Sequence, residues 1–350
     1  MKYHFEEIDM YKPGIVLGNQ SPKEILQYAV GALLYTPASH PKIVDTLLEN
    51  AYPDLKSWAF CLEDSLTDQA SEQAAELLVH SLQHLAECVQ NGQSSAENLP
   101  LIFIRVRSPQ QIEKLFTRLA DIDWLLSGFI APKFETSNML AYLASMRQIN
   151  TNSTHMLYLM PILESQSVIY KESRMTELLA LQKALAADKD QILNIRVGGN
   201  DFCNLFGLRR GISQCVYDIG VIADVLSDIM NVFGRDYVVS GPVWEYFGTE
   251  KGGAWQLGLE NELRADRLNG FIGKTAVHPT QLRPIHRSLI VDEADYLDAQ
   301  QILNWQDENL GVCKGVQIER MNEQRVHQQW ARKILALANV YGVKRTVNHG

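Results

Sequence analysis

The fold is decided by the segment between residues 101 and 135, LIFIRVRSPQQIEKLFTRLADIDWLLSGFIAPKFE. It opens with a nearly continuous apolar run, Leu101–Val106, which is typical of a parallel strand that is covered on both faces. An amphipathic stretch follows at Pro109–Leu119, and a second β-prone run follows at Gly128–Ala131. A strand, a helix and another strand in this order indicate a βαβ unit, so we predict an α/β protein with a parallel sheet.

The same unit recurs along the chain. Strands are predicted at Ala32–Thr36, Trp58–Leu62, Leu101–Val106, Gly128–Ala131, Leu157–Ile162, Ile192–Val197, Tyr237–Ser240 and Phe271–Val277. Further helices are predicted at Gln69–Cys88, Glu172–Ala187, Cys215–Phe233 and Gly253–Arg267. Eight strands with helices between them predict a (β/α)8 TIM barrel. The alternative, a doubly wound open sheet, normally carries a Gly-rich phosphate turn after its first strand, and here that turn reads TPASH.

Two segments lie outside the predicted barrel. Residues 1–30 form an N-terminal extension, residues 31–291 the barrel, and residues 292–350 a C-terminal helical tail. The tail contains two helical stretches, Glu293–Glu308 and Asn322–Val340. Apolar positions along the second stretch indicate packing, either on the chain's own barrel or on a neighbouring subunit.

The composition narrows the class of protein. Of the 350 residues, 46% are hydrophobic and 21% charged, which is ordinary for a globular protein, and the net charge is −9. Because nucleic acids and membrane surfaces are polyanionic, this charge argues against both as partners. The five cysteines are odd in number and form no CxxC pair, which argues against a disulfide framework or a structural zinc site. With no secretory signal and no membrane span, we expect a cytoplasmic protein.

Charged residues follow most of the predicted strands, where TIM barrels place their active sites. They are Glu63, Asp64, Arg105, Arg107, Lys133, Glu135, Glu164, Asp201, Lys274 and His278. A solvated loop explains any one of them, but the set favours an active site for an anionic small molecule. We expect substrate-binding residues among these strand ends and turns, namely Arg107, Lys133, Pro37, Ser39, Gly241 and Pro242.

Glu164 and Asp201 are the candidate metal ligands, because they follow adjacent strands. Magnesium is typically bound by one or two carboxylates, with waters and substrate completing the coordination. The chain has no HExxH spacing and no Cys/His cluster, so zinc is disfavoured. Magnesium acting as a Lewis acid would stabilise the enolate that forms when a carbon–carbon bond of an oxo- or hydroxy-acid breaks.

Arg105 and Arg107 are the candidate binders of the substrate's negative charge. Because they are two positions apart, a regular strand would point both to one side, and arginine binds carboxylates bidentately. A salt bridge to Glu63 or Asp64 is the alternative, and both interpretations can hold together.

The remaining candidates have weaker support. Lys133 and Lys274 are either Schiff-base lysines or, as we favour, anion binders. His278 is either a proton donor or, as we favour, a structural histidine. Ser39 and Ser240 have no evident base partner, which disfavours nucleophilic catalysis.

Short motifs in barrel order resemble the HpcH/HpaI aldolase and citrate lyase beta-subunit superfamily, from about residue 31 to about residue 340. The matching stretches are LYTPAS at 34–39, FCLED at 60–64, IRVR at 104–107, APKFE at 131–135, PILES at 161–165, GGNDF at 198–202, GLR at 207–209, GK at 273–274 and HPTQ at 278–281.

The resemblance implies roles for several of these residues. It implies that Glu164 and Asp201 bind magnesium, that Arg105 contacts the substrate, and that Glu63 or Asp64 holds the metal's waters or orients the arginine. In the tail, KGVQIE at 314–319 resembles a family motif whose last residue, here Glu319, serves as catalytic acid or base, often in a neighbouring subunit. The resemblance therefore also implies a homo-oligomer, a trimer or hexamer.

The chain departs from the family at four places. Cys61 stands where the family usually has Asp, Arg107 where it often has Asn, and Glu319 where the tail motif ends in Asp. Residues 28–30 lack the basic residues that help hold the phosphates of CoA. These departures weaken the case for a CoA thioester substrate. We therefore predict a magnesium-dependent carbon–carbon lyase or aldolase for another anionic oxo- or hydroxy-acid. The alternatives are a phosphoenolpyruvate-type barrel enzyme and a non-catalytic metal- or ligand-binding subunit.

Overall fold

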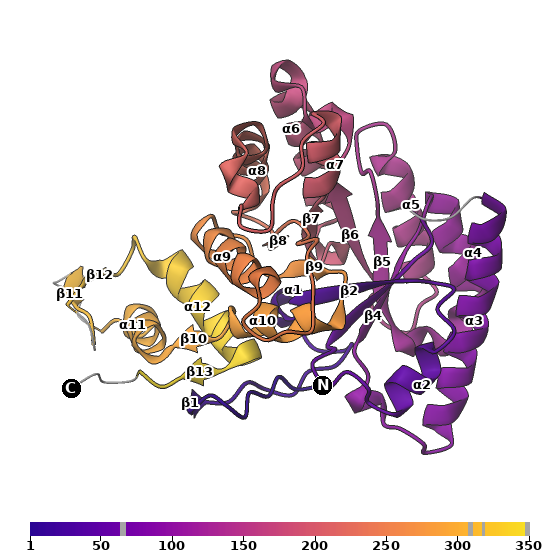
Figure 1. Cartoon of the computed structure of the whole chain (residues 1–350), viewed down its shortest axis with the longest axis horizontal. Helices are drawn as coiled ribbons and strands as arrows, with labels where there is room; N and C mark the ends of the chain where they lie inside the picture. The colour runs from indigo at the N-terminus through magenta and orange to yellow at the C-terminus, as the bar shows by residue number, and fades with distance from the viewer. Residues whose placement is uncertain (64–67, 307–310, 317–318, 347–350) are drawn as a thin grey trace.

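Eight parallel strands form one nearly closed barrel in the computed structural model, which describes residues 1–63, 68–306, 311–316 and 319–346 (Figure 1). Their order is β8-β7-β6-β5-β4-β3-β2-β9. An isolated bridge between Gly241 and Lys274 links the two ends of the sheet. The (β/α)8 barrel is thus confirmed, and the open doubly wound sheet is wrong. The strands are β2 Ala32–Pro37, β3 Ser57–Cys61, β4 Leu101–Arg105, β5 Leu126–Ala131, β6 Tyr158–Leu163, β7 Ile195–Val197, β8 Val239–Ser240 and β9 Lys274–Ala276.

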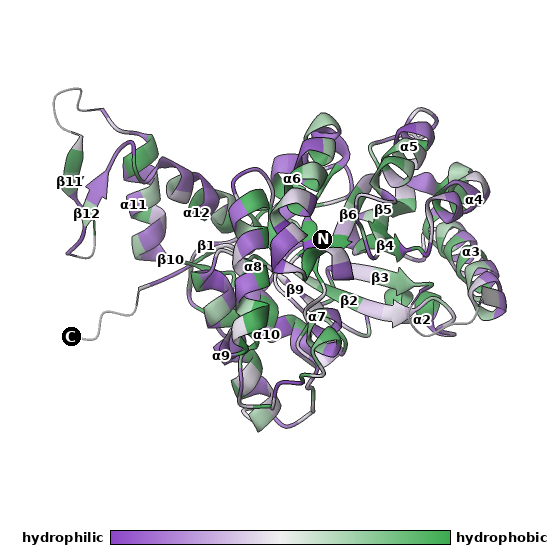
Figure 2. Cartoon of the chain, turned by 90° about the horizontal axis from the view of Figure 1, so that it is seen from above, coloured by the Kyte–Doolittle hydropathy of each residue, from purple (hydrophilic) through white to green (hydrophobic). Residues whose placement is uncertain are grey.

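Helices cover the outside of the barrel (Figures 1 and 2). The helix after β4 shows why they form: Ser108 caps it by accepting from the Gln111 N–H, and Pro109 fits its first turn. Four apolar residues of this helix, all on its inner face, are buried. The helices are α2 Ile43–Leu48, α3 Asp68–Gln90, α4 Pro109–Leu119, α5 Met139–Asn150, α6 Lys171–Ala187, α7 Gly199–Leu205, α8 Gly220–Phe233, α9 Ala254–Leu268 and α10 Leu282–Arg287.

The hydrophobic core has two parts. One fills the space between the strands and the surrounding helices. The other contains inward-facing strand residues such as Leu33, Phe103 and Met160, together with residues of the N-terminal segment and the tail. The barrel's interior is therefore packed.

The N-terminal segment and the tail pack together beside the barrel. The short strands β1 (Met10–Lys12), β13 (Val343–Lys344) and β10 (Val291–Asp292) form a three-stranded sheet. Helix α12 (Gln328–Tyr341) contacts both α1 (Lys23–Ala29) and α11 (Glu293–Leu303) of the same chain. Contact with a neighbouring subunit, and the domain boundaries at residues 30 and 291, stay predictions.

The second helical stretch of the tail begins later than predicted. Residues Met321–Glu323 form strand β12, which pairs antiparallel with β11 (Val312–Lys314). This pairing draws residues 321–323 into a hairpin, so the helix starts only at Gln328. Among the described residues, no helix has the length and apolar character needed to cross a membrane.

The base of the barrel contains a fully buried histidine that makes stability depend on pH. The Nε2 atom of His286 accepts from the Ala32 N–H at 3.2 Å, and burial, with the nearby charge of Lys56, lowers its pKa to about 3. In the unfolded chain the histidine binds a proton near pH 6.5. As pH falls from 6.5 towards 3, protonation therefore favours the unfolded chain, and the folded state loses about 1.4 kcal/mol per pH unit.

We expect the His286→Asn variant to lack this contribution. Urea unfolding between pH 7 and 4.5 measures it as the difference in slope between variant and wild type. His80→Asn, at an exposed position of α3, is the control and should keep the wild-type slope. Equal slopes for wild type and His286→Asn would show that His286 does not carry the effect.

Candidate active site

Arg105, the last residue of β4, is the centre of a buried ionic cluster. Its Nη2 atom lies 2.9 Å from Glu63 Oε2 and 3.1 Å from Glu164 Oε1. Its Nη1 atom lies 3.7 Å from Cys61 Sγ, and its guanidinium lies over the ring of Tyr35, 5.7 Å from the ring centroid. Only 4% of the arginine is exposed. Two carboxylates from β3 and β6 thus fix its direction, and the predicted salt bridge to Glu63 is present.

Lys133 joins the same two carboxylates from the end of β5. Its backbone N–H donates to Glu164 Oε1 at 3.0 Å, and its Nζ donates to Glu63 Oε1 at 2.6 Å. Its φ of 47° lies in the left-handed region that non-glycine residues rarely adopt. The side chain of Asn138 holds this turn by donating to the Lys133 carbonyl at 2.9 Å. The strained backbone thus aims both donors of Lys133 at the cluster.

Glu164 and Asp201 meet around Gly198. Glu164 directly follows β6, and Asp201 lies in the first turn of α7. A Cβ atom on Gly198 would stand 2.6 Å from Glu164 Oε2 and 3.0 Å from Asp201 Oδ2. Both oxygens therefore face one point that only glycine leaves open.

The surroundings of this point suit a small, hard cation. Glu164 and Asp201 line a pocket of about 330 Å³ with Lys133, Glu135, Ser165, Gln166, Asn204 and Leu205. Within the described ranges, no group of three or more His, Cys, Asp or Glu side chains is placed to hold a metal. Two carboxylates with space for waters fit magnesium, whereas zinc usually takes three or four protein ligands.

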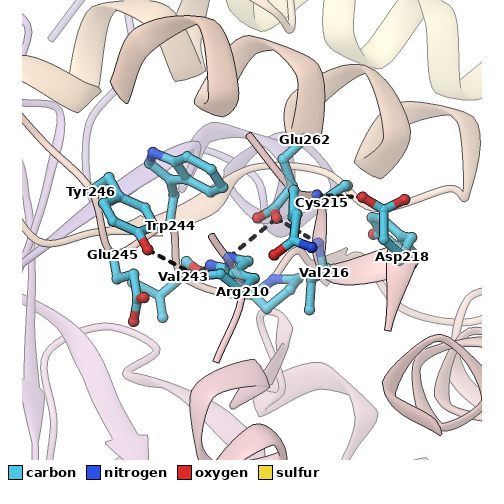
Figure 3. A network of polar contacts seen from close by, with 12 residues as sticks. Arg210, Cys215, Val216, Asp218, Val243, Trp244, Glu245, Tyr246 and Glu262 are labelled. Carbon is cyan, nitrogen blue, oxygen red and sulfur yellow. Dashed lines mark hydrogen bonds and ion pairs between the residues drawn. The ribbon is translucent and has the colours of Figure 1, made fainter. Parts of the chain in front are cut away.

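A second ionic network holds the loops that follow β7 and β8 (Figure 3). The guanidinium of Arg210 lies over the Trp244 ring, 5.1 Å from its centroid, and its Nε lies 3.5 Å from Glu262 Oε2. It also donates to the carbonyl of Val243. The same Glu262 oxygen accepts from the Val216 N–H at 2.9 Å. Glu262 of α9 thereby ties both loops to the barrel wall.

Lys274 belongs to this network. Its Nζ lies 2.9 Å from Glu262 Oε1 and 2.8 Å from Asp266 Oδ2, and it also donates to the carbonyl of Pro242. The lysine is fully buried. The Schiff-base and anion-binding interpretations of Lys274 are therefore both wrong, because two carboxylates of its own chain already neutralise the ammonium group.

Comparison with known proteins identifies the family. The family model described as "C-C_Bond_Lyase of the TIM-Barrel fold" matches residues 24–343. The chain belongs to this family. It is therefore a carbon–carbon lyase, as the sequence predicts, which argues against the alternative of a non-catalytic subunit. No curated protein matched the sequence.

Solved structures share the fold of this lyase. Protein CitE from Mycobacterium tuberculosis, in complex with magnesium, acetoacetate and coenzyme A, is 16% identical, with a TM-score of 0.56 over 89% of this chain and 99% of that one. The citrate lyase beta subunit of M. tuberculosis, complexed with oxaloacetate and magnesium, is also 16% identical, with a TM-score of 0.50 over 75% of this chain and 98% of that one.

Two predicted substrate-binding residues of the lyase lie at the end of β2. Pro37 pairs with Cys61 in the sheet, and the intervening Ala38 N–H donates to the Cys61 carbonyl at 3.0 Å. Pro37 and Ser39 are exposed beside the strand that carries Cys61. They thus flank the Arg105 cluster, and their contact with substrate stays a prediction.

Gly241 and Pro242 lie where the barrel of the lyase closes. The Gly241 N–H donates to the Gly273 carbonyl at 2.9 Å, and a Cβ on Gly241 would stand 2.8 Å from Asp266 Oδ2. The ring of Pro242 packs against Gly199 at the start of α7. Both residues are buried, so their placement ties them to barrel closure, and their predicted role in substrate binding is untested.

Arg107 lies two residues beyond the end of the strand that carries Arg105. Strand β4 ends at Arg105, so the alternation of a regular strand does not extend to Arg107. Arg107 lines a groove of about 1280 Å³ between α3 and α4, with Lys114 and Arg118. The expectation that both arginines point to one side therefore does not follow from the strand. Asp64 lies outside the described residues.

Glu319 lies far from the cluster of its own chain. It is exposed, pairs with Lys314 at 3.2 Å and follows strand β11 of the tail hairpin. Both views place this hairpin at the opposite end of the molecule from β3, β4 and β5 (Figures 1 and 2). Glu319 therefore does not reach the Arg105 cluster of the same chain, and its predicted role requires a neighbouring subunit.

The predicted structural roles fit the geometry. Nδ1 of His278 lies 2.8 Å from Thr280 Oγ1, and its ring stacks on Phe247 at a centroid distance of 4.5 Å. Ser240 is fully buried and exchanges hydrogen bonds with the Asn194 side chain. Among the described residues, the side chain of Ser240 hydrogen-bonds Asn194 and Arg196, neither of which is a general base, and His278 is held in place by its neighbours.

Sequence reasoning missed one buried arginine of the site region, Arg196. A signal was present in the run Ile192–Val197, because Asn194 and Arg196 alternate with apolar residues. This period of two places both polar side chains, and Gly198 after them, on the inner side of the barrel.

Proposed function

We propose that this lyase breaks or forms a carbon–carbon bond in an anionic oxo- or hydroxy-acid, with magnesium held by Glu164 and Asp201. The observation that carries the proposal is the opening at Gly198, towards which both carboxylates point an oxygen. The magnesium in the two solved relatives, beside oxaloacetate in one and acetoacetate in the other, supports it.

Each residue of the cluster has a chemical task in this proposal. Magnesium, when bound, supplies Lewis-acid stabilisation of the negative charge that develops as the bond breaks. Arg105 neutralises charge on the same substrate oxygens, and its two carboxylate partners keep it oriented without reorganisation. Lys133 holds Glu63, which in turn orients Arg105.

The proton is moved by Glu319 of a neighbouring copy in a homo-oligomer, a trimer or hexamer. The exposure of Glu319 and its distance from its own barrel support this arrangement. We further propose that the protein is cytoplasmic, since all five cysteines are free.

Titration calorimetry of magnesium into wild type and a Glu164→Gln, Asp201→Asn double variant tests the proposal. We expect wild type to bind magnesium, more tightly when oxaloacetate or pyruvate is present, and the double variant to bind none. The control is Glu76→Gln, Asp236→Asn, which removes two exposed carboxylates whose partners are Arg118 and Lys189. Unaltered binding in the first double variant would reject the carboxylate pair as the metal site.

A further inference from the structure

Arg196 lies inside the barrel, on the strand that leads to Gly198. It is the middle residue of β7, and its side chain alternates in register with Gly198 two positions later. Its Nη2 donates to Thr275 Oγ1 at 2.8 Å and its Nη1 to Ser240 Oγ at 3.3 Å. Only 2% of the residue is exposed. A guanidinium thus lies buried on the inner side of the strand that leads to the proposed metal site.

This arginine differs from the other buried cations because no carboxylate neutralises it. Five arginine and lysine side chains are buried in the described part of the chain, and four of them have a carboxylate partner: Arg105 with Glu63 and Glu164, Arg174 with Asp224 and Asp228, Arg210 with Glu262, and Lys274 with Glu262 and Asp266. Arg196 forms no ion pair within the described ranges, and its Nε has no hydrogen-bond partner there. Hydroxyl groups alone do not compensate a buried charge.

The neighbours of Arg196 connect it to the active site. Burial lowers the pKa of the guanidinium, and the positive charge of Arg105 acts in the same direction. Arginine nevertheless stays protonated in proteins, so two positive groups lie near the half-buried Tyr35. Thr275 is also half-buried, and because its oxygen accepts from Arg196, its own O–H points elsewhere. The positive charge of Arg196 and the oriented hydroxyl of Thr275 together favour the binding of an anion beside them.

We propose that Arg196 is a positioning residue for a second carboxylate of the substrate, so that the lyase acts on a dicarboxylate and not on a monocarboxylate. The inference rests on the proposed function and narrows its substrate class. Arg105 would engage the acid group next to the reacting carbon, and a magnesium ion held by Glu164 and Asp201 would supply Lewis-acid stabilisation there. Arg196 acts on the second carboxylate through its charge and through the Thr275 hydroxyl that it orients, and it receives its missing counter-charge when the substrate binds.

The stability of an Arg196→Met variant separates this role from a purely structural one. Methionine removes an uncompensated charge and keeps most of the side-chain volume, so we expect the urea midpoint without ligand to equal or exceed that of wild type. The matched control is Arg174→Met, which breaks ion pairs with Asp224 and Asp228 and should lower the midpoint. A fall in Arg196→Met as large as that in the control would overturn the proposal.

Ligand binding supplies the second readout. Malate and 2-hydroxybutyrate differ in one carboxylate, which is a methyl group in the latter, and both are titrated with magnesium present. We expect wild type to prefer malate by about tenfold or more, Arg196→Met to reduce the ratio below about threefold, and Arg196→Lys to restore part of it. A wild type without this preference, or an Arg196→Met variant that keeps it, would refute the dicarboxylate assignment.

Titration of magnesium without malate or 2-hydroxybutyrate distinguishes a failure of the proposed metal site from a failure of the role proposed for Arg196. Arg196→Met should bind magnesium as wild type does, because the guanidinium of Arg196 donates its hydrogen bonds to Ser240 and Thr275 and not to the two proposed metal ligands. A wild type that binds no magnesium would reject the metal site of the proposed function, whereas the stability comparison and the malate preference would still decide the role of Arg196.

Discussion

A Gly198→Ala variant is expected to lose magnesium binding by about 100-fold or more while keeping its fold. The added methyl group would stand 2.6 Å from Glu164 Oε2 and would also press on the Cβ of the same residue. One or both carboxylates must therefore turn away. Magnesium requires nearly ideal octahedral geometry, so a small displacement of its ligands weakens binding strongly. Titration calorimetry measures the affinity, and circular dichroism confirms the fold.

Gly220→Ala is the matched control for this variant. Gly220 is the first residue of α8, and a Cβ at this position meets no atom within 4 Å. The control should bind magnesium with wild-type affinity. Wild-type affinity in Gly198→Ala would instead show that the two carboxylates do not share a cation at this point.

The barrel could be predicted from the sequence because its strands are buried on both faces. Runs such as Leu101–Val106 leave no polar face, and a charge such as Arg105 or Glu164 then marks the place where each strand reaches the C-terminal end. The ion pair between Arg105 and Glu63 follows from the same rule, since adjacent parallel strands end side by side. Local pattern and topology were sufficient for these features.

Other features depend on tertiary contacts that no local pattern encodes. The sequence predicts both Lys274 and Lys133 near strand ends, yet Lys274 is the first residue of β9 and its ammonium group is neutralised by two carboxylates of α9. The partners lie on a helix whose rotation about its axis the sequence does not determine. Likewise, residues 321–323 would fit a helix until strand β11 offers them a hydrogen-bonding partner. The opening at Gly198 is a third case, because Gly-Gly pairs occur for many reasons.

Replacing Lys274, the buried lysine where the barrel closes, is expected to have the second large effect, a loss of stability. A Lys274→Met variant should lose about 3–5 kcal/mol of unfolding free energy, because Asp266 would remain buried without a counter-charge and Glu262 would keep only Arg210 as its partner. Lys189→Met removes an exposed pair with Asp236 and should cost less than about 1 kcal/mol. Urea unfolding measures both, and equal losses in the two variants would contradict the assigned role of Lys274.

A double variant tests whether the loss comes from charge. If Asp266→Asn is added to Lys274→Met, the stranded carboxylate disappears, and part of the lost stability should return. No recovery would mean that packing, and not the unpaired carboxylate, dominates. Because Lys274 also bonds the carbonyl of Pro242 after β8, the measured loss reports how firmly the last two strands are joined. The closure of the barrel thus depends on an ion pair that lies between strand β9 and helix α9, outside the catalytic cluster.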